Sequence, residues 1–464
     1  MSRYPRWIAL LCTLASAGLM LLREFCWPLA WLAPVPLLWL AFSNRSFRTI
    51  ALCTAAAVVM WALPLVAPIV FASGLAALPR VTLLVGFLAL SLIACVTLAR
   101  IASQKLHPVL ALLAFPAAWT AATYLFHLLA GGDTAGLGAY SQVDVPLLVQ
   151  SAAVTGLWGI EFMLALFAGG LVLILRNRAS ARYYAAITLG LVSVNLGYGY
   201  WRLSAPVGTT IRVAAAAHDL PLAFRPPNAD DPAAGVIALY ASAALDLAHQ
   251  GAQVIVFPEL TSILPSERRQ ELLAPLAAAA HSTGASITMG FADLNAAGQL
   301  HNVALTFQPD GELRQYIKRH TLVPLDPSIP GAVAGNIGAG RAVAICKDLD
   351  FPATIRRDSQ SDVRLLLVPA ADFEADGWIH ARMAILRGVE NGFSMVRAAR
   401  NGVVSVTDDR GRVLARAKST AHGIASVMAT VPYGAADTLY RRCGDWFAWL
   451  CLAFTVVVVV LLRR

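Results

Sequence analysis

Residues 253–259 read Gln-Val-Ile-Val-Phe-Pro-Glu, a short apolar run that ends at the carboxylate of Glu259. A run of this length, rich in β-branched residues and closed by proline, predicts a buried strand. Similar runs lie at 211–216, 286–291, 303–307, 342–346, 364–368, 394–398 and 403–407, and helical patterns at 232–249, 267–282 and 378–391 alternate with them. Strands that alternate with helices predict a layered α/β domain with a largely buried sheet.

The chain on either side of this region consists mainly of apolar stretches. Of its 464 residues, 58% are hydrophobic and 14% charged, unlike a soluble protein. Stretches long enough to cross a bilayer lie at 7–22, 27–42, 50–72, 81–99, 108–130, 155–175, 184–201 and 446–462. The first is interpreted as a retained span, since no convincing signal cleavage site precedes Arg23. The sequence predicts a membrane domain over 1–205, a globular domain over 206–440 and a last span within 441–464.

Basic residues predict the orientation of these spans. Alternate loops carry Arg3, Arg6, Arg45, Arg48, Arg100, Lys105, Arg176, Arg178 and Arg182, whereas the intervening short loops offer Arg23 and Arg80. Because cytoplasmic loops are rich in Lys and Arg, we expect a cytoplasmic N-terminus and an extracytoplasmic globular domain. This orientation places three basic residues on the extracytoplasmic side: Arg202, Arg441 and Arg442. They are weak evidence against it, because residues that flank a long translocated domain have little influence on membrane topology. Orientation also explains the net charge of +9 better than a nucleic-acid partner does.

Three polar residues of the globular part end β-like runs: Glu259, Lys318 and Cys346. Catalytic groups collect at strand ends in open α/β sheets. A carboxylate that takes the thiol proton, a thiolate that attacks and an ammonium that stabilises the oxyanion suit acyl transfer. Taken singly, they are also explained as a helix-start carboxylate, a solvated lysine and a buried thiol. Spacing alone leaves both interpretations open.

Metal and nucleotide sites have little support. Cys346 is the only one of seven cysteines in the globular part, and no CxxC or Cys/His ligand spacing occurs. Neither a structural zinc site nor a disulfide framework is therefore expected. No GxGxxG follows a strand in the right place and no GxxxxGK[ST] occurs, which argues against nucleotide binding.

The motifs around the three polar residues resemble those of the nitrilase superfamily. They are Phe257-Pro258-Glu259, Tyr316-Ile317-Lys318-Arg319-His320 with Leu322-Val323-Pro324, and Ile345-Cys346-Lys347-Asp348. Residues 382–392 and 396–402 resemble the superfamily's segment after the nucleophile. In the membrane part, 138–142, 146–147 and 156–162 resemble the pre-domain segment of apolipoprotein N-acyltransferases, which also place a nitrilase domain between the seventh and eighth spans. The resemblance covers nearly the whole chain.

This resemblance implies about eight spans in the bacterial inner membrane and an extracytoplasmic nitrilase-like α-β-β-α sandwich. It implies a ping-pong reaction: Cys346 takes a fatty acyl group from a phospholipid and passes it to the α-amino group of a diacylglyceryl-cysteine lipoprotein. Glu259, Lys318 and Cys346 are then catalytic, and Asp326 and Asp348 support the lysine and the thiolate. No metal or organic cofactor is implied, because the acyl group travels on the thiol.

Several positions depart from the family pattern. They are Phe257 for the usual Trp, His218 and Asp219 for Gln-Asn, Asp326 and Asp348 for Glu, and Lys347 for an aromatic or apolar residue. Lys347 either lowers the thiol pKa of Cys346 or points to solvent. An alternative function is a membrane-anchored amidase or acyltransferase of the same superfamily that acts on another amine or amide. A catalytically idle scaffold is a third, which the intact Glu, Lys and Cys set opposes.

Three further features have two interpretations each. Glu161, inside an apolar run, is either buried against a partner or hydrated near the interface. Arg397 and Arg400 either contact a phosphate head group or form a structural ion pair. Residues 326–340, rich in Pro, Gly and Ala, form either a mobile flap over the site or a surface loop.

Overall fold

The computed structural model of the chain describes residues 6–43, 46–220, 231–322, 325–374, 377–434 and 437–464. Arg3 and Arg45, used for orientation, and Val323 and Pro324 of the Lys motif lie outside the described residues. The chain divides into two compact units. We call Met1–Ser204 with Cys443–Arg464 the membrane unit, and Ala205–Arg442 the globular unit.

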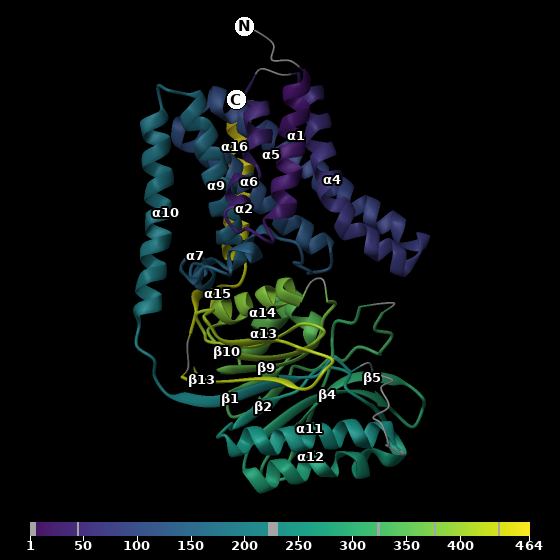
Figure 1. The fold of residues 1–464 in the computed structure, drawn as a ribbon. Coiled ribbons are helices and arrows are strands. Elements are labelled where there is room, and N and C mark those ends of the chain that lie inside the picture. The colour runs from purple at the N-terminus through teal and green to yellow at the C-terminus, as the bar shows by residue number, and fades with distance from the viewer. Residues whose placement is uncertain (1–5, 44–45, 221–230, 323–324, 375–376, 435–436) are drawn as a thin grey trace. The chain divides into compact units, whose positions relative to one another are not determined.

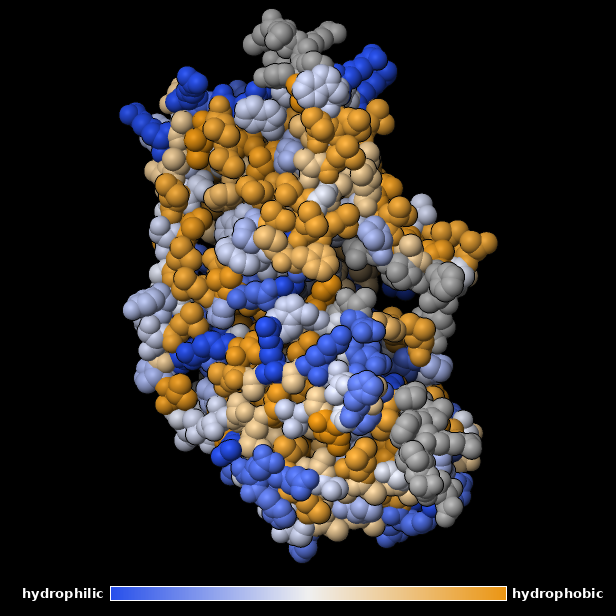
Figure 2. Space-filling view, viewed as in Figure 1, coloured by the Kyte–Doolittle hydropathy of each residue, from blue (hydrophilic) through white to orange (hydrophobic). Residues whose placement is uncertain are grey.

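Long apolar helices make up the membrane unit (Figure 1). They are α1 (Arg6–Leu22), α4 (Phe47–Ser73), α5 (Leu78–Lys105), α6 (Pro108–Leu129), α9 (Leu157–Arg176), α10 (Ala181–Ser204) and α16 (Trp446–Arg463). Shorter helices are α2 (Leu29–Leu32), α3 (Val35–Ala41), η1 (Leu75–Ala77), η2 (Gly138–Gln142), α7 (Pro146–Val149) and α8 (Ala152–Thr155). Figure 2 shows hydrophobic side chains over much of the surface of these helices, as expected where lipid is the solvent.

Six helical segments in the described part of the chain are long and apolar enough to cross a membrane. Five lie in α4, α5, α6, α9 and α16, where spans were predicted. The sixth, α11 (Pro232–His249), lies in the globular unit and buries one face against the core there.

The other three predicted spans differ from these five. The span predicted over 27–42 is divided into α2 and α3 at Ala33 and Pro34, since prolines at 34 and 36 supply no N–H to continue the helix. Helix α1 is a shorter apolar helix of 17 residues, and α10 is not among the six membrane-length segments of the described chain. The membrane unit is thus confirmed as a multi-helix apolar body, with a span count that is approximate.

Two sheets form the centre of the globular unit. The first has the order β13 (Ala425–Pro432), β1 (Thr210–Ala217), β2 (Val254–Val256), β4 (Ser286–Leu294), β5 (Leu300–Phe307), β6 (Leu313–Ile317), with β3 (Ile263–Pro265) paired to β4. The second has the order β12 (Val413–Lys418), β11 (Val403–Thr407), β10 (Ser394–Arg400), β9 (Leu365–Ala371), β8 (Arg341–Val343), β7 (Asn336–Gly338). Strands β1, β2 and β4 are parallel, as are β8, β9 and β10.

Strand alternation builds the layers. In β1, Val213 and Ala215 belong to a core between the sheets, whereas Ala214 and Ala216 belong to a core shared with α11 and α12 (Arg269–Thr283). Figure 1 shows α11 and α12 on the face of the first sheet and α13 (Pro352–Ser359) and α14 (Gly377–Asn391) on that of the second. The remaining short helices are η3 (Ser266–Arg268), η4 (Cys346–Asp350) and α15 (Leu439–Cys443). The predicted α-β-β-α sandwich of the nitrilase type is confirmed.

The strand predicted over 342–346 is shorter than expected. It ends at Val343, and Cys346 begins the turn η4 with a backbone φ of +43°. A non-glycine residue at positive φ cannot continue a strand. The turn lifts the Cys346 side chain out of the regular sheet.

Candidate active site

Glu259 lies just beyond β2, where both sheets hold its backbone. Its N–H donates to the carbonyl of Ala370 in β9 at 3.3 Å. Gly290 in β4 passes so close that a Cβ there would lie 2.5 Å from Glu259 Cα, so glycine is required at this approach. The side chain of Glu259 is buried, with 2% of the residue exposed. The carboxylate is therefore fixed between the two sheets.

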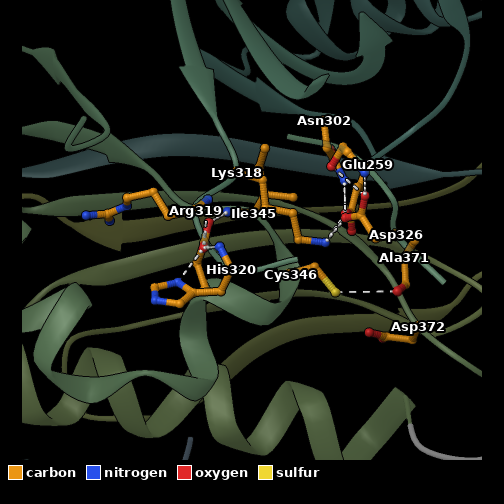
Figure 3. A network of polar contacts seen from close by, with 12 residues as sticks. Glu259, Asn302, Lys318, Arg319, His320, Asp326, Ile345, Cys346, Ala371 and Asp372 are labelled. Atoms are coloured by element: carbon orange, nitrogen blue, oxygen red, sulfur yellow. Dashed lines mark hydrogen bonds and ion pairs between the residues drawn. The ribbon is translucent and has the colours of Figure 1, made fainter. Parts of the chain in front are cut away.

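Lys318, which follows β6, connects two carboxylates. Its Nζ lies 2.6 Å from Oε1 of Glu259 and 2.9 Å from Oδ2 of Asp326. Asn302 in β5 donates through Nδ2 to the same two oxygens, at 2.7 and 3.0 Å. Ser328 Oγ donates to the other oxygen of Asp326 at 2.5 Å. Figure 3 shows the side chains of Glu259, Asn302 and Asp326 close to that of Lys318, so the lysine is held from several sides.

The charges of this cluster hold one another in the ionised form. Burial alone lowers the pKa of Lys318, but the negative charges of Glu259 and Asp326 and the hydrogen bond to Glu259 outweigh burial and raise it. For Asp326, burial raises the carboxyl pKa, and the Lys318 ammonium with the donated hydrogen bonds lowers it below its ordinary value overall. Lys318 is consequently a cation and Asp326 an anion near neutral pH.

Cys346 points toward this cluster from the second sheet (Figure 3). The residue is half-buried, and its Sγ donates to the carbonyl of Ala371 at 3.4 Å. Burial and the negative charge of Glu259 raise the pKa of the thiol well above its ordinary value of 9.0, and the Lys318 ammonium offsets part of that rise. At rest the sulfur is therefore a thiol, which needs a base before it can attack.

One oxygen of the cluster is suited to be that base. Oε2 of Glu259 is buried and has no hydrogen-bond partner among the described residues, while Oε1 accepts from Lys318 and Asn302. The structure thus gathers a protonated thiol, a carboxylate oxygen able to accept a proton and a fixed cation. These are the groups that nucleophilic acyl transfer requires. Of the five residues singled out from the sequence, Glu259, Lys318, Cys346 and Asp326 meet here.

Asp348, the fifth, is a fully buried acceptor that holds the backbone on both sides of the site. Its Oδ2 accepts from Tyr316 Oη at 2.6 Å and from the N–H of Ile345 at 3.0 Å. Its Oδ1 accepts from the N–H groups of Arg319 and His320, at 3.3 and 3.0 Å. Asp348 therefore fixes the residues directly before Cys346 and directly after Lys318.

Asn302 was missed at the level of sequence, although a signal was present. Its neighbours Val303 and Leu305 in β5 belong to the core beneath α11 and α12, whereas Ala304 faces the core between the sheets. Positions 302 and 304 are two residues apart and so lie on the same face of the strand. The fully buried amide of Asn302 therefore also faces the space between the sheets. A polar residue at an inward strand position indicates a partner in the interior.

The structure shows the contacts of two residues that depart from the family pattern, Phe257 and Lys347. Phe257 is fully buried and packs against Tyr240 of α11, with ring centroids 4.8 Å apart. Lys347 lies 2.8 Å from Asp350 and its Nζ lies 5.7 Å from the centroid of the Phe351 ring. Lys347 was expected either to lower the thiol pKa of Cys346 or to point to solvent. Its ion pair with Asp350 supports neither interpretation.

Arg397 forms a structural ion pair. Its guanidinium is buried, and its Nη1 and Nη2 donate to the two oxygens of Asp372 at 3.0 and 2.5 Å. The residue before Asp372 is Ala371, the acceptor of the Cys346 thiol. Arg400 donates through Nη1 to the carbonyl of Leu220 at 3.2 Å. The ion-pair interpretation therefore fits Arg397, and Arg400 has a structural contact of its own.

The glycine-rich stretch 326–340 is hydrogen-bonded to the sandwich at several points. The N–H of Gly331 donates to Lys318 O at 2.8 Å, and Gly335 O accepts from the N–H of Val343 at 2.8 Å. Residues 336–338 form β7 at the edge of the second sheet. The stretch links the Lys318 side of the site to β8, and its movement as a flap stays a prediction.

Comparison with known proteins gives matches over both units. Residues 210–435 match the family of carbon-nitrogen hydrolases, and residues 9–170 match the N-terminal domain of apolipoprotein N-acyltransferases. Together the two matches extend over most of the chain.

Individual relatives agree with these matches. The apolipoprotein N-acyltransferase of Geobacter metallireducens is 26% identical over 94% of this chain and 91% of its own length. That of Shewanella oneidensis is 26% identical over 76% of this chain and 74% of its own. Among solved structures, an amidase from Nesterenkonia sp. aligns at 20% identity with 53% of this chain and 99% of its own, with a TM-score of 0.43. On the two domain matches and the two N-acyltransferase relatives, the chain belongs to the apolipoprotein N-acyltransferase family of the nitrilase superfamily.

Proposed function

We propose that this membrane-bound acyltransferase moves a fatty acyl group from a phospholipid to the N-terminal amine of a diacylglyceryl-cysteine lipoprotein, through a thioester on Cys346. One observation supports this above the others. Glu259 presents an oxygen with no hydrogen-bond partner in the described chain, beside a buried lysine and a protonated thiol. Family membership supplies the substrate class.

In the first half-reaction, Glu259 Oε2 takes the proton of the Cys346 thiol as Sγ attacks the ester carbonyl carbon of the phospholipid. Negative charge develops on the carbonyl oxygen, and the Lys318 ammonium stabilises it in a site of low dielectric constant. The carbon–oxygen bond then breaks, and the leaving lysophospholipid hydroxyl receives the proton from Glu259. The products are a Cys346 thioester and a lysophospholipid.

In the second half-reaction, the neutral α-amine of the acceptor attacks the thioester carbonyl. The carbon–sulfur bond breaks, Glu259 accepts the amine proton, and that proton returns to the Cys346 sulfur. The raised pKa of the thiol favours its reprotonation once the amide has formed. The enzyme regains its starting state without any other reactant.

The cellular placement is also a proposal. Long apolar helices make the chain a membrane protein. Basic residues in alternate loops support a cytoplasmic N-terminus, with the globular unit on the extracytoplasmic side of the bacterial inner membrane. On that side the enzyme would meet lipoproteins that have crossed the membrane, and the bilayer would supply the donor.

The identity of the acceptor is tested with purified enzyme in phospholipid vesicles and a synthetic diacylglyceryl-cysteine lipopeptide. We expect a mass increase of one fatty acyl group on the lipopeptide, lost when its amine is acetylated beforehand and absent with Cys346→Ala. Transfer to a simple amine with none to the lipopeptide, or release of free fatty acid alone, would instead support another acyltransferase or an amidase of the superfamily.

A further inference from the structure

The turn that carries Cys346 is held to the end of β6 at more than one point. The first attachment is Asp348, which accepts from the N–H groups of Arg319 and His320 and from Tyr316 Oη. This attachment lies inside η4, close to the nucleophile. Taken by itself, it would leave the residues that follow in η4 and α13 free to shift.

A second attachment lies at the far end of the same segment, in α13. The two oxygens of Asp358 accept from Nη1 of Arg319, at 3.2 Å, and from its Nη2. Both groups are largely buried, with 11% of the Arg319 side chain and 6% of the Asp358 side chain exposed. A carboxylate bound by both arms of a guanidinium is held in direction as well as in distance. Residues 346–358 are therefore fixed at both ends.

Arg319 also connects the two attachments. Its Nε donates to Tyr316 Oη at 3.1 Å, and that hydroxyl donates to Asp348 Oδ2 at 2.6 Å. Between the two attachments, the His320 ring stacks on Phe351, with centroids 3.7 Å apart and planes inclined by 12°. Buried polar groups in such a network strengthen one another, so the network fixes the turn firmly only while every member is present.

We propose that the Arg319–Asp358 ion pair is a positioning pair for acyl transfer, which sets the distance between the Lys318 ammonium and the Cys346 sulfur. Arg319 follows Lys318 directly in the chain, and Asp358 lies in the helix that follows the Cys346 turn. A shift between the two therefore moves the cation relative to the nucleophile. The effect on the rate rests on the proposed function, whereas the effect on the thiol does not.

The reactivity of the Cys346 thiol reports this distance. Burial raises the pKa of the thiol, and the Lys318 ammonium offsets part of the rise. A greater separation of Nζ and Sγ would raise the pKa further, leave less thiolate at a given pH and slow alkylation. Looser packing alone would have the opposite effect, because a more exposed thiol reacts faster. The sign of the change thus separates positioning from a loss of stability.

The test compares full-length Asp358→Asn with wild type in phospholipid vesicles. A misplacement of about 1 Å costs about 100-fold in rate, so for a partial shift we expect kcat per folded enzyme to fall about tenfold, with KM unchanged. Iodoacetamide labelling of Cys346 at a fixed pH should slow. Equal or faster labelling would overturn the proposal. Slower labelling, together with no acyl transfer in wild type, would contradict the proposed function and leave the positioning pair standing.

Asp408→Asn is the matched control. Asp408 is 2% exposed and its Oδ2 accepts from Arg412 Nε at 2.6 Å, so it is also a buried partner of an arginine. It follows Thr407, which pairs with Met395 near the start of β10, whereas Cys346 lies at the opposite ends of the parallel strands. We expect a lower Tm, with kcat per folded enzyme and the labelling rate of Cys346 unchanged.

Arg319→Gln removes the same ion pair from its other side and decides the matter if Asp358→Asn does not fold. We expect the same fall in kcat and the same slower labelling. In the double variant, kcat should be no lower than in Arg319→Gln alone, because residues that act through one contact are not additive. Losses that multiply in the double variant would show that the two side chains act separately and would contradict the proposal.

Discussion

Lys318 and Glu259 form a buried ion pair in which Nζ lies 2.6 Å from Oε1, while Oε2 of the same carboxylate has no hydrogen-bond partner in the described chain. The two carboxylate oxygens of Glu259 therefore have different roles. Oε1 holds the lysine, and Oε2 is able to accept the proton of Cys346. A symmetric pair would engage both oxygens and leave the thiol without a base.

Asn302 fixes this asymmetry, because its Nδ2 donates to Glu259 Oε1 and Asp326 Oδ2. Asn302→Leu removes both hydrogen bonds at similar side-chain volume. A hydrogen bond to a charged group contributes about 1.5–3 kcal/mol, so we expect loss of the bond that orients Glu259 to lower kcat/KM for acyl transfer by about 10- to 100-fold. Steady-state kinetics in vesicles give the measurement.

Thr306→Val is the matched control on the same strand. It removes a buried hydroxyl that pairs with Thr288 at 2.8 Å and leaves both carboxylates untouched. We expect a lower Tm with kcat/KM close to wild type. Equal losses of activity in the two variants would mean that Asn302 acts through general strand stability.

The Cys346 thiol is expected to react slowly with alkylating agents at neutral pH. Burial and Glu259 raise its pKa above 9.0, so thiolate forms late as pH rises. The rate of iodoacetamide labelling at Cys346, followed by peptide mass spectrometry, should keep increasing above pH 9. The exposed Cys26 and Cys443 serve as internal references.

Replacing the neighbouring carboxylate should accelerate this labelling. Glu259→Gln removes one of the negative charges that raise the pKa of Cys346, so more thiolate is present at a given pH. The same variant should abolish acyl transfer, since it lacks the base. Slower alkylation in Glu259→Gln would contradict the electrostatic assignment.

Gly335 places the glycine-rich stretch against β8. A Cβ at this position would lie 1.9 Å from the carbonyl oxygen of Val343, three residues before Cys346. Gly335→Ala must therefore displace the backbone that carries the nucleophile. Since a misplacement of about 1 Å costs about 100-fold in rate, we expect a loss of that order in kcat. Gly208→Ala, with no atom within 4 Å of the added Cβ, should behave as wild type in the same assay.

The Asp372–Arg397 pair predicts acid sensitivity. Burial raises the pKa of Asp372, but Arg397 and His380 lower it below 3.8 overall. A lowered pKa stabilises the fold above the unfolded-state value, and the contribution is lost as pH falls through the folded value. The Tm of wild type should therefore drop as pH falls below about 4.

Asp372→Asn tests this assignment at both ends of the pH range. Near neutral pH we expect a loss of about 3–5 kcal/mol, because Arg397 is left buried without its counter-ion. Below the folded pKa the difference from wild type should narrow, since wild type has lost the same charge. A difference that does not change with pH would show that the carboxylate does not titrate as assigned.

The sequence predicts the strand end that carries Glu259, because an apolar run closed by Pro258 is a local signal. The positive φ of Cys346 and the short β8 were not predicted, since they depend on the packing of η4 against neighbouring strands. Asn302 was missed for the same reason: its role exists only once β5 lies beside β6. Local patterns define the elements, and pairing between them defines the site.

The membrane unit shows the same limit. Runs of apolar residues correctly predicted α4, α5, α6, α9 and α16. The number of spans is approximate, because Pro34 divides one predicted span and α10 has a lower mean hydropathy than the other long helices. Glu161 was noticeable as a carboxylate in an apolar run. Its neighbour across Gly138, Arg23, was used only for orientation, because their approach arises from tertiary packing.

The most direct test of the account is the intact mass of the full-length protein after incubation with phospholipid and without acceptor, in wild type and Cys346→Ala. The account predicts a fatty-acyl increment on wild type that hydroxylamine removes, that vanishes when an amine acceptor is added, and that Cys346→Ala lacks. An increment of equal size on folded Cys346→Ala, or none on wild type with several phospholipids, would contradict a thioester on Cys346.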